Sequence, residues 1–320
     1  MPAITAVAPG KIILFGEHAV VYGRPAIAVP VSQVQARVIV TAMPRSDPGE
    51  VLIQAPDVGL EARLDELPAD HPLASAVRGV LSTLGIARPP ACMVRITSTI
   101  PVAAGLGSGA AVTVAILRAL PAFLGQALPN ERISALAYEV EKLYHGTPSG
   151  IDNTVITYAM PVYFVRGEPM QTLRLPEPFT MVIGDTGISS PTAIAVGDVR
   201  RLWQADPTGY EAIFDAIGKI AQAARQSIES GRPELLGSLM DENYALLHEL
   251  NVSSPELDRL VEAARVAGAL GAKLSGGGRG GNMIALVETE AARRVAQALQ
   301  DHGAVRTIIT TVKEATGVYD

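Results

Sequence analysis

The sequence predicts an α+β protein made of two domains. Its 320 residues exceed the usual size of a single hydrophobic core. Apolar residues make up 48% of the chain and charged residues 18%, which is typical of a globular protein rather than a disordered or fibrous one. Runs typical of strands and helices are mixed in both halves without strict βαβ alternation, so α+β is favoured over a doubly wound parallel sheet.

The first half begins with strands. Gly and Pro separate three short strand-like runs within residues 5–42, namely KIILFG, PAIAVPV and ARVIVTA. A further strand-like run, ACMVRITS (91–98), precedes a glycine-rich loop and a helical stretch over 110–124. Apolar side chains at helical spacing after Pro129-Asn130 predict a second helix that ends before His145.

The run MPVYFV (160–165) predicts a strand, and three prolines follow it within residues 167–178. We therefore place the domain boundary here, with an N-terminal domain over 1–167 and a C-terminal domain over 168–320. Beyond the boundary the sequence predicts, in chain order, a strand at 181–185, helices at 208–230, 234–249 and 255–269, a second glycine loop at 276–281, a strand at 282–287, a helix at 290–300 and a strand at 304–312.

Net charge, cysteine content and hydropathy indicate which partners and which cellular compartment to expect. The formal net charge is -6 and no run of Lys and Arg offers a track for a phosphate backbone, so we expect no nucleic acid. The single cysteine, Cys92, excludes an internal disulfide and a multi-cysteine zinc site. The longest uncharged stretch, 96–117, holds Pro101 and three glycines and is a poor membrane segment. We expect a cytoplasmic protein with no membrane partner.

The glycine-rich loop PVAAGLGSGAAV (101–112) admits several interpretations. A triphosphate loop of the GxxxxGK[ST] kind is excluded, because no Lys occurs over 101–120. Gly105, Gly107 and Ala110 fit the dinucleotide fingerprint, but Glu131, the acidic residue at the required distance, follows a helix start rather than a strand. Two readings stay open: glycines that serve tight helix packing, or backbone amides that hold a phosphate at a helix N-terminus, with Ser108 adding a hydroxyl.

A phosphate cradle without its own lysine must take its charged groups from elsewhere. Lys11 lies in a segment whose other residues predict a buried strand, and four apolar residues follow Lys11 directly. We therefore expect Lys11 to have an acidic partner. Glu17, His18 and Tyr22 crowd into the same segment.

Two carboxylates in the segment EKLYHGTPSGIDNTV (141–155) are further candidates. Glu141 falls on the last turns of a predicted helix, where the helix dipole disfavours a carboxylate unless a cation compensates it. Asp152 falls in a Gly-Ile-Asp-Asn turn that we expect to precede an apolar strand, and taken alone it would be an ordinary turn residue.

Four segments together resemble, in order and spacing, the motifs of the GHMP small-molecule kinases: PGKIILFGEHAVVYG, PVAAGLGSGAAV, HGTPSGIDN and KLSGGGRGG. The likeness covers most of the chain, since DTGISSPT (185–192) and ALGAKLSGGG (269–278) are similar as well. Within the family, GEHAVVYGRPAIA is most similar to the members that act on mevalonate, whereas galactokinases have an Asp-Tyr pair soon after the His.

The resemblance implies a GHMP kinase fold, with an N-terminal domain of the ribosomal-S5 type, a C-terminal α+β domain and the active site in the cleft between them. It implies ATP-dependent phosphorylation of the primary hydroxyl of mevalonate, giving 5-phosphomevalonate, with Mg²⁺ as the cofactor; a homodimer is left open. By position, Asp152 matches the catalytic base and Lys11 the lysine that pairs with it, while Glu141 matches the metal ligand. Glu17 and His18 match positions near the acceptor.

The resemblance also implies which loop residues bind the ATP phosphates, and Ser108 is in addition a second candidate metal ligand. These residues are Pro101, Ala104, Gly105, Leu106, Gly107, Ser108, Gly109 and Ala110. The family loop usually has a second Ser where this chain has Gly109, and the third motif usually has Gly where Arg279 stands. The first departure affects the coordination of the metal, and the second affects the charge near the phosphates.

Two rival functions remain. A sibling kinase of the same family would act on phosphomevalonate, homoserine or a sugar, and a phosphorylated acceptor would need basic residues beyond Lys11 and Arg24, which are all that residues 8–28 offer. A non-catalytic ligand sensor on the same fold is the other rival. The joint presence of Lys11, Glu141 and Asp152 disfavours a sensor, because binding alone does not need all three.

Overall fold

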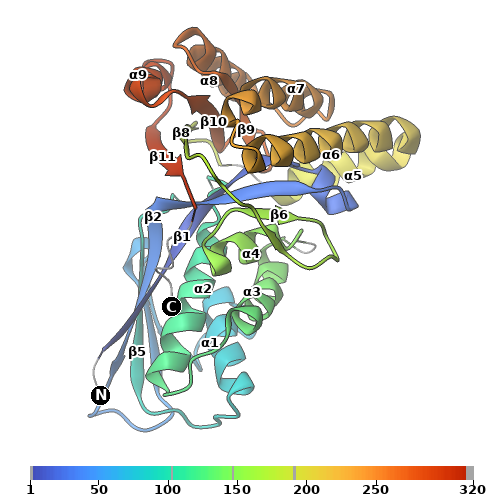
Figure 1. Cartoon of the computed structure of the whole chain (residues 1–320). Helices are drawn as coiled ribbons and strands as arrows, with labels where there is room; N and C mark the ends of the chain where they lie inside the picture. Colours follow the sequence, from blue (N-terminus) through green and yellow to red (C-terminus); the bar gives the residue numbers. More distant parts are fainter. Residues whose placement is uncertain (1–2, 102–103, 146–147, 190–191, 315–320) are drawn as a thin grey trace. The chain divides into compact units, whose positions relative to one another are not determined.

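The computed structural model describes residues 3–101, 104–145, 148–189 and 192–314 (Figure 1). The chain divides into two compact units that alternate along the sequence. Unit 1 holds Met1–Gly10, Val34–Pro101 and Gly107–Tyr158, and unit 2 holds Lys11–Gln33, Val102–Leu106 and Ala159–Asp320. The chain thus passes between the units several times, whereas the sequence predicted a single boundary after residue 167; that boundary stays a prediction.

Two long strands belong to both units. These are β1 (Ile4–Phe15) and β2 (Ala26–Ala42), which pair with each other. The sequence predicted two separate strands over 25–31 and 36–42, and the structure joins them in β2. Its residues Ala26–Ala28 pair with β6, and Ala36–Ala42 pair with β5, so Pro30 lies between these two paired segments. A proline is tolerated in a strand where its missing N–H interrupts no ladder bond.

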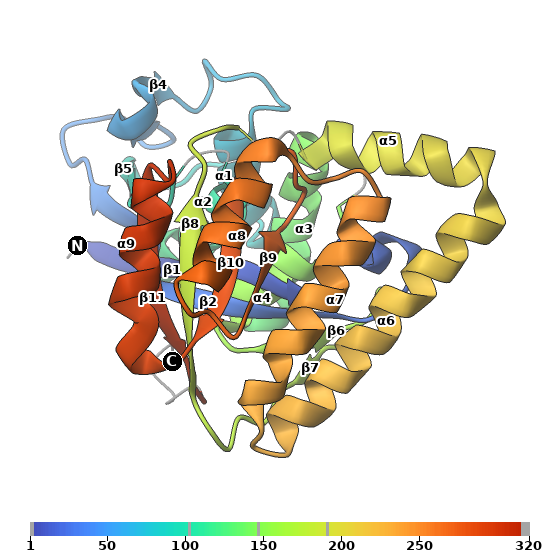
Figure 2. The ribbon, with the colours of Figure 1, turned by 90° about the horizontal axis from the view of Figure 1, so that it is seen from above.

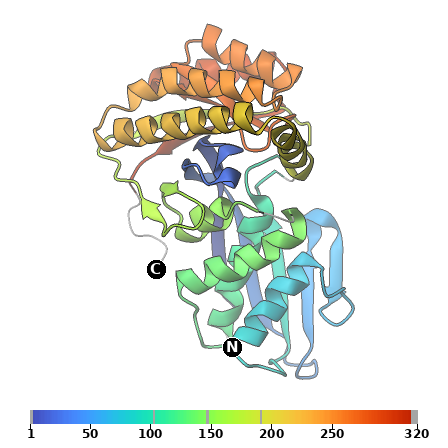
Figure 3. The same cartoon turned by 90° about the vertical axis from the view of Figure 1, so that its right-hand side faces the viewer.

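Unit 1 packs four helices beside short strands. The other strands are β3 (Val51–Ala55), β4 (Leu60–Arg63) and β5 (Cys92–Ser98), and the helices are α1 (Pro72–Thr83), α2 (Ser108–Phe123), α3 (Asn130–His145) and α4 (Ile151–Tyr158). Strand β3 pairs in parallel with β5 and antiparallel with β4. Helix α2 is buried over most of its length because Ala, Val, Ile and Leu occupy nearly all its faces, and α1, α3 and α4 pack around it (Figure 3).

Unit 2 is built on an antiparallel sheet of order β11-β8-β10-β9. Its strands are β8 (Phe179–Asp185), β9 (Gly271–Ser275), β10 (Asn282–Val287) and β11 (Arg306–Val312). Strands β6 (Val162–Phe164) and β7 (Gln171–Thr172) pair with each other, and β6 also pairs with β2. The helices are α5 (Thr192–Ala205), α6 (Pro207–Glu229), α7 (Leu236–Glu249), α8 (Pro255–Val266) and α9 (Ala292–Asp301). Helices α6 and α7 run side by side, and α7, α8 and α9 pack on the sheet (Figure 2).

Local sequence explains where these helices begin and which face they bury. Ser254 caps α8 by accepting a hydrogen bond from the Leu257 amide, and Pro255 follows at the first helical position. Helix α9 buries a stripe of residues spaced three and four apart, which are Ala292, Val295, Ala296 and Leu299. The cap thus determines where α8 begins, and the apolar stripe determines which face of α9 packs on the sheet.

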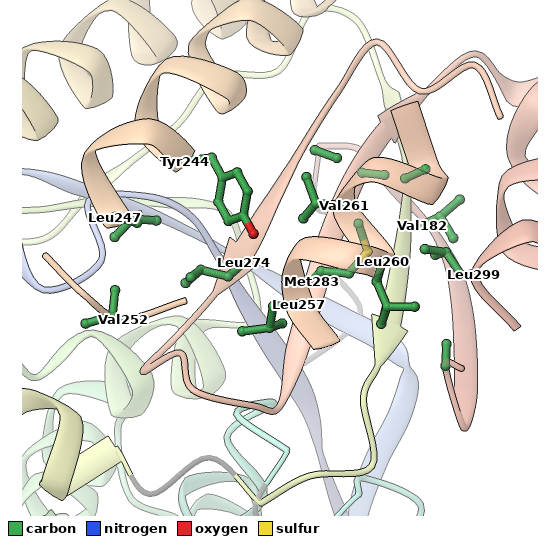
Figure 4. Packing of buried hydrophobic residues seen from close by; sticks show 14 of the residues in the cluster. Val182, Tyr244, Leu247, Val252, Leu257, Leu260, Val261, Leu274, Met283 and Leu299 are labelled. Carbon is green, nitrogen blue, oxygen red and sulfur yellow. The ribbon is translucent and has the colours of Figure 1, made fainter. Parts of the chain in front are cut away.

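The core of unit 2 forms between α7, α8, α9 and the four-stranded sheet. Figure 4 shows side chains from helices and strands meeting in one cluster, among them Leu247, Leu257, Leu260, Val261, Leu274, Met283 and Leu299. Burying a leucine fully is worth about 1.5–3 kcal/mol relative to exposure, so this cluster is a main source of the unit's stability. No helix in the described part of the chain is both long and apolar enough to span a bilayer.

The α+β class predicted from sequence is confirmed, and so are the strands and helices predicted at 91–98, 110–124, 208–230 and 282–287. One local prediction is wrong. The segment after Asp152 forms helix α4 rather than a strand. Helices α1 and α5 and strands β3, β4 and β7 were not predicted.

Candidate active site

The first glycine loop leads into α2 through left-handed backbone. Gly105 has a φ of 82° and Gly107, the residue that precedes the helix, a φ of 74°, a region that side chains other than glycine enter at a cost. No side chain caps this end of α2. The first amides of a helix have no partner within the helix, so this end offers N–H donors and the positive pole of the helix dipole to an anion.

Ser108 and Gly109 are the first two residues of α2. Gly109 therefore has helical backbone, and a serine at that position would meet no barrier from a positive φ. A left-handed Gly109 would instead have disfavoured the serine that the family loop usually has at this position.

Lys11 lies on β1 in unit 2 and is only 4% exposed. Its main-chain N–H donates to the Leu106 carbonyl of the first glycine loop at 3.0 Å. Two residues further, the Ile13 N–H donates to Ser275 Oγ at 3.0 Å, and that hydroxyl donates in turn to the Ile13 carbonyl at 2.9 Å. These backbone bonds fix the strand that carries Lys11 against the first glycine loop and against β9.

Glu17 forms a buried ion pair that the sequence did not reveal. Its Oε1 is bonded to Nζ of Lys273 on β9, and both side chains are 0% exposed. Lys273 Nζ also donates to the Leu274 carbonyl at 2.8 Å. Burial raises the pKa of Glu17, while the charges of Lys273 and Lys11 lower it; burial likewise lowers the pKa of Lys273. The sequence placed Glu17 near the acceptor, and the structure shows its carboxylate held by Lys273.

His18 has a strained backbone conformation, and its ring contacts the second glycine loop, Gly276–Gly281. Its φ is 61°, its side chain is buried, and Nε2 lies 3.1 Å from the carbonyl oxygen of Gly277. Burial lowers the pKa of His18 to about 4; the bond to Gly277 opposes this shift and the charge of Arg279 adds to it. The imidazole is therefore neutral at pH 7.

The partner of Nε2 decides the tautomer of His18. A carbonyl oxygen only accepts, so Nε2 carries the proton and Nδ1 is an acceptor. Nδ1 is buried and has no hydrogen-bond partner among the described residues. In this tautomer the unpaired Nδ1 suits the hydrogen of a hydroxyl group or of water.

Glu141, Asp152 and Ser108 all lie in unit 1, on three helices that pack against one another. Glu141 is buried on α3, and Asp152 is the second residue of α4. A carboxylate in the first turn of a helix is stabilised by the helix dipole. Asn153 ties α4 to α3 by donating to the Ser134 carbonyl at 3.1 Å and to Ser134 Oγ at 2.9 Å.

The donor set in unit 1 suits Mg²⁺. Within the described residues no three His, Cys, Asp or Glu side chains gather into a metal cage. Mg²⁺ commonly takes one or two protein oxygens and completes its shell with phosphates and water. A buried carboxylate on Glu141 and the hydroxyl of Ser108 are oxygen donors of that kind, so the residues fit this ion.

The second glycine loop, Gly276–Gly281, completes the set of motifs in unit 2. Most of its glycines have positive φ, and a Cβ on Gly278 would lie 1.9 Å from the Val252 carbonyl oxygen. Beyond the loop, the side-chain amide of Asn282 donates to the Ala104 carbonyl. This bond joins the start of β10 to the first glycine loop.

Family models match two parts of the chain. The description "GHMP kinases N terminal domain" matches residues 73–160, and "GHMP kinases C terminal" matches residues 224–305. The chain belongs to the GHMP kinase family. This GHMP kinase is 39% identical to the mevalonate kinase of Pyrococcus horikoshii, over 97% of this chain and 96% of the relative, and 40% identical to that of Thermococcus gammatolerans, over 97% of each.

Solved structures agree with the sequence relatives. The crystal structure of L. major mevalonate kinase in complex with R-mevalonate is 30% identical, with a TM-score of 0.82 over 97% of this chain and 96% of that one. The predicted family and fold are therefore confirmed. The roles given to individual site residues stay predictions.

Proposed function

We propose that this GHMP kinase transfers the γ-phosphate of ATP to the primary hydroxyl of mevalonate, giving 5-phosphomevalonate for isoprenoid precursor synthesis. The observation that carries this is similarity of 39–40% identity to mevalonate kinases over nearly the whole of both chains. A match of that extent includes both units, and the match to a structure holding R-mevalonate points to the same acceptor.

The start of α2 is the proposed cradle for the triphosphate. Its uncapped amides and helix dipole stabilise phosphate charge without a lysine in the loop. Glu141 and Ser108 are the proposed ligands of Mg²⁺, which when bound neutralises charge on the phosphate oxygens.

Asp152 and Lys11 are the proposed catalytic residues. The acceptor hydroxyl oxygen forms a bond to the γ-phosphorus, the bond from that phosphorus to the bridging oxygen of ADP breaks, and the hydroxyl proton passes to the Asp152 carboxylate. The Lys11 ammonium stabilises negative charge on the hydroxyl oxygen as the proton leaves. Both roles rest on the match of these residues to the family motifs.

His18 is the residue that we propose orients the acceptor. Mevalonate carries hydroxyl groups that can donate to an open imidazole nitrogen, and Nδ1 of His18 is such an acceptor. A neutral ring also avoids a strong attachment to the acceptor carboxylate, which would hold substrate and transition state equally.

Three further expectations stay predictions. Mg²⁺ is the proposed metal, and a homodimer is left open. A reducing cytoplasm is proposed because the chain has a single cysteine, Cys92, which cannot form an internal disulfide.

The experiment is ADP release measured with mevalonate, phosphomevalonate, homoserine and galactose as separate acceptors, with the product identified by mass. We expect kcat/KM for mevalonate to exceed the others by about a hundredfold or more, because an acceptor that fails to match the site's hydrogen bonds leaves buried polar groups unpaired. Turnover with another acceptor of the set would favour a sibling kinase, and binding of ATP and mevalonate without turnover would favour a sensor.

A further inference from the structure

Arg279 is the one residue of the second glycine loop, Gly276–Gly281, that carries a long side chain. It has a φ of 57°, which is left-handed backbone where a non-glycine residue is strained. Such a conformation persists when surrounding contacts hold it, so the contacts of Arg279 show what the residue does.

The side chain of Arg279 joins the loop to two other segments of unit 2. Nη1 bonds Oδ2 of Asp198 on α5 at 2.5 Å, and Nε and Nη2 donate to the Asn251 carbonyl at 3.3 and 3.2 Å. The Arg279 main-chain N–H donates to the carbonyl of Val252 at 2.8 Å. One residue thus connects the loop with α5 and with the turn between α7 and α8.

Helix α5 and the segment before it, which holds Ile188, enclose the neighbouring glycines. A Cβ on Gly277 would lie 2.8 Å from Thr192 Oγ1, at the start of α5, and a Cβ on Gly280 would lie 2.8 Å from the Ile188 carbonyl. The Gly281 N–H donates to that Ile188 carbonyl at 2.8 Å. The path of the loop therefore depends on where α5 and the α7–α8 turn hold it.

The charge of Arg279 is already compensated. Asp198 neutralises it, and hydrogen bonds from Arg279 and Arg201 lower the pKa of Asp198, so this carboxylate is ionised. Two further donors of the guanidinium, Nε and Nη2, bond the Asn251 carbonyl. The sequence predicted that Arg279 affects the charge near the phosphates. In the structure its side chain bonds Asp198 and the Asn251 carbonyl instead.

The loop held in this way carries the carbonyl that orients His18. Gly277, two residues before Arg279, accepts the Nε2 hydrogen of His18 at 3.1 Å. A shift of the loop moves this carbonyl, and the ring that depends on it turns with it. The charge of Arg279 also helps to keep His18 neutral, after the larger effect of burial.

We propose that Arg279 is a positioning residue for the acceptor: its clamp on Asp198 and Asn251 holds the second glycine loop so that the Gly277 carbonyl directs Nδ1 of His18 at the acceptor. This inference rests on the proposed function. It differs from a phosphate-binding role, which would act on ATP.

Arg279→Gly tests the clamp, because glycine removes the side chain and also relieves the positive φ. We expect KM for mevalonate to rise about tenfold while KM for ATP changes by less than about twofold, since misplacing a positioning group weakens orientation of one substrate. Arg279→Lys keeps the charge but lacks the fork that bridges two partners, so we expect an intermediate KM for mevalonate.

Arg201→Gln is the matched control. Arg201 also pairs with Asp198, at 2.9 Å, but it lies on the same helix three residues away and is 73% exposed. Its loss takes one partner from the same carboxylate without releasing the loop, so both KM values should stay within about twofold of wild type.

Asp198→Asn gives an independent test of the same contact. It should raise KM for mevalonate in the same direction as Arg279→Gly but by less, because the bonds to the Asn251 carbonyl remain. The double variant should be no worse than Arg279→Gly alone, because glycine already removes the contact with Asp198. Amide hydrogen exchange should rise in peptides covering 276–281 and the first turns of α5 in both variants, and not in Arg201→Gln.

Independent, multiplying effects of the two substitutions would overturn the clamp, as would a rise in KM for ATP alone. If wild type fails to phosphorylate mevalonate, the proposed function fails, yet the exchange data still decide whether Arg279 holds the loop. Unchanged exchange at 276–281 in Arg279→Gly would overturn the inference whatever the acceptor.

Discussion

Replacing Lys273 with methionine should destabilise unit 2 strongly. The substitution removes the cation of a pair whose two side chains are both 0% exposed. It leaves the buried Glu17 carboxylate with the weaker effects of its own backbone amide and of the Lys11 charge. The second carboxylate oxygen of Glu17 already lacks a hydrogen-bond partner among the described residues. Removing one partner of a buried ion pair costs about 3–5 kcal/mol, a large part of the stability of a protein.

The loss should depend on pH with a definite sign. Without Lys273, two contributions that lower the pKa of Glu17 vanish, so its pKa in the folded state rises further above the value in the unfolded chain. An acid with a raised folded pKa leaves stability intact below its unfolded pKa and loses it as pH rises, because the unfolded chain releases the proton more easily. Lys273→Met should therefore be least destabilised near pH 4.5 and increasingly so toward the folded pKa of Glu17.

Urea unfolding followed by circular dichroism at several pH values between 4.5 and 8 measures this. The matched control is Lys142→Met, which removes an ion pair with Glu139 in which the side chains are 42% and 64% exposed and should cost less than about 1 kcal/mol. The double variant Glu17→Gln with Lys273→Met removes the stranded charge and should abolish the extra pH dependence. A cost below about 1 kcal/mol at pH 8, or equal costs at all pH values, would refute the reasoning.

Four further predictions concern catalysis. Asp152→Asn should lower kcat more than about tenfold and leave ATP affinity within a few-fold, because the amide cannot take the proton; titration calorimetry with ATP supplies the binding control. Lys11→Met should lower kcat far more than it raises KM for ATP, and an effect confined to KM for ATP would move Lys11 to the phosphates. His18→Ala should raise KM for mevalonate with little change in ATP binding, and an unchanged KM for mevalonate would leave His18 a purely structural role. Glu141→Gln should raise the Mg²⁺ concentration needed for half-maximal rate, whereas Gly109→Ser should lower it; a fully stable Gly109→Ser protein that needs more Mg²⁺ than wild type would contradict the proposed metal site.

Sequence patterns predicted the fold where local pattern and burial agree. The apolar helix α2 and the amphipathic stripes of α6 and α8 were predicted because one period runs through each. Helix α4 was missed because Thr154, Val155 and Ile156 are β-branched and favour a strand, while contacts with α2 and α3 hold the segment in a helix. Tertiary packing of this kind leaves no mark in a short window of sequence.

The partners of site residues were less predictable than their positions. Glu17 and Lys273 are 256 residues apart, so no local signal joins them. The local signal was that each residue lies in an apolar segment. Such a segment predicts that a buried charge has a partner but does not identify the partner residue. The tautomer of His18 and the clamp of Arg279 likewise depend on backbone carbonyls, Gly277 and Asn251, whose directions only the folded chain defines.

Transfer from ATP to the primary hydroxyl of mevalonate is tested most directly by the fate of that oxygen. Mevalonate labelled with ¹⁸O in its primary hydroxyl is incubated with ATP, Mg²⁺ and the wild-type chain, and the products are read by ³¹P NMR, in which ¹⁸O shifts the signal of the bonded phosphorus. We expect the label in the ester bridge of 5-phosphomevalonate and none in ADP, because the hydroxyl oxygen attacks the γ-phosphorus. Unlabelled phosphomonoester, inorganic phosphate alone, or phosphate on the other hydroxyl would contradict the account.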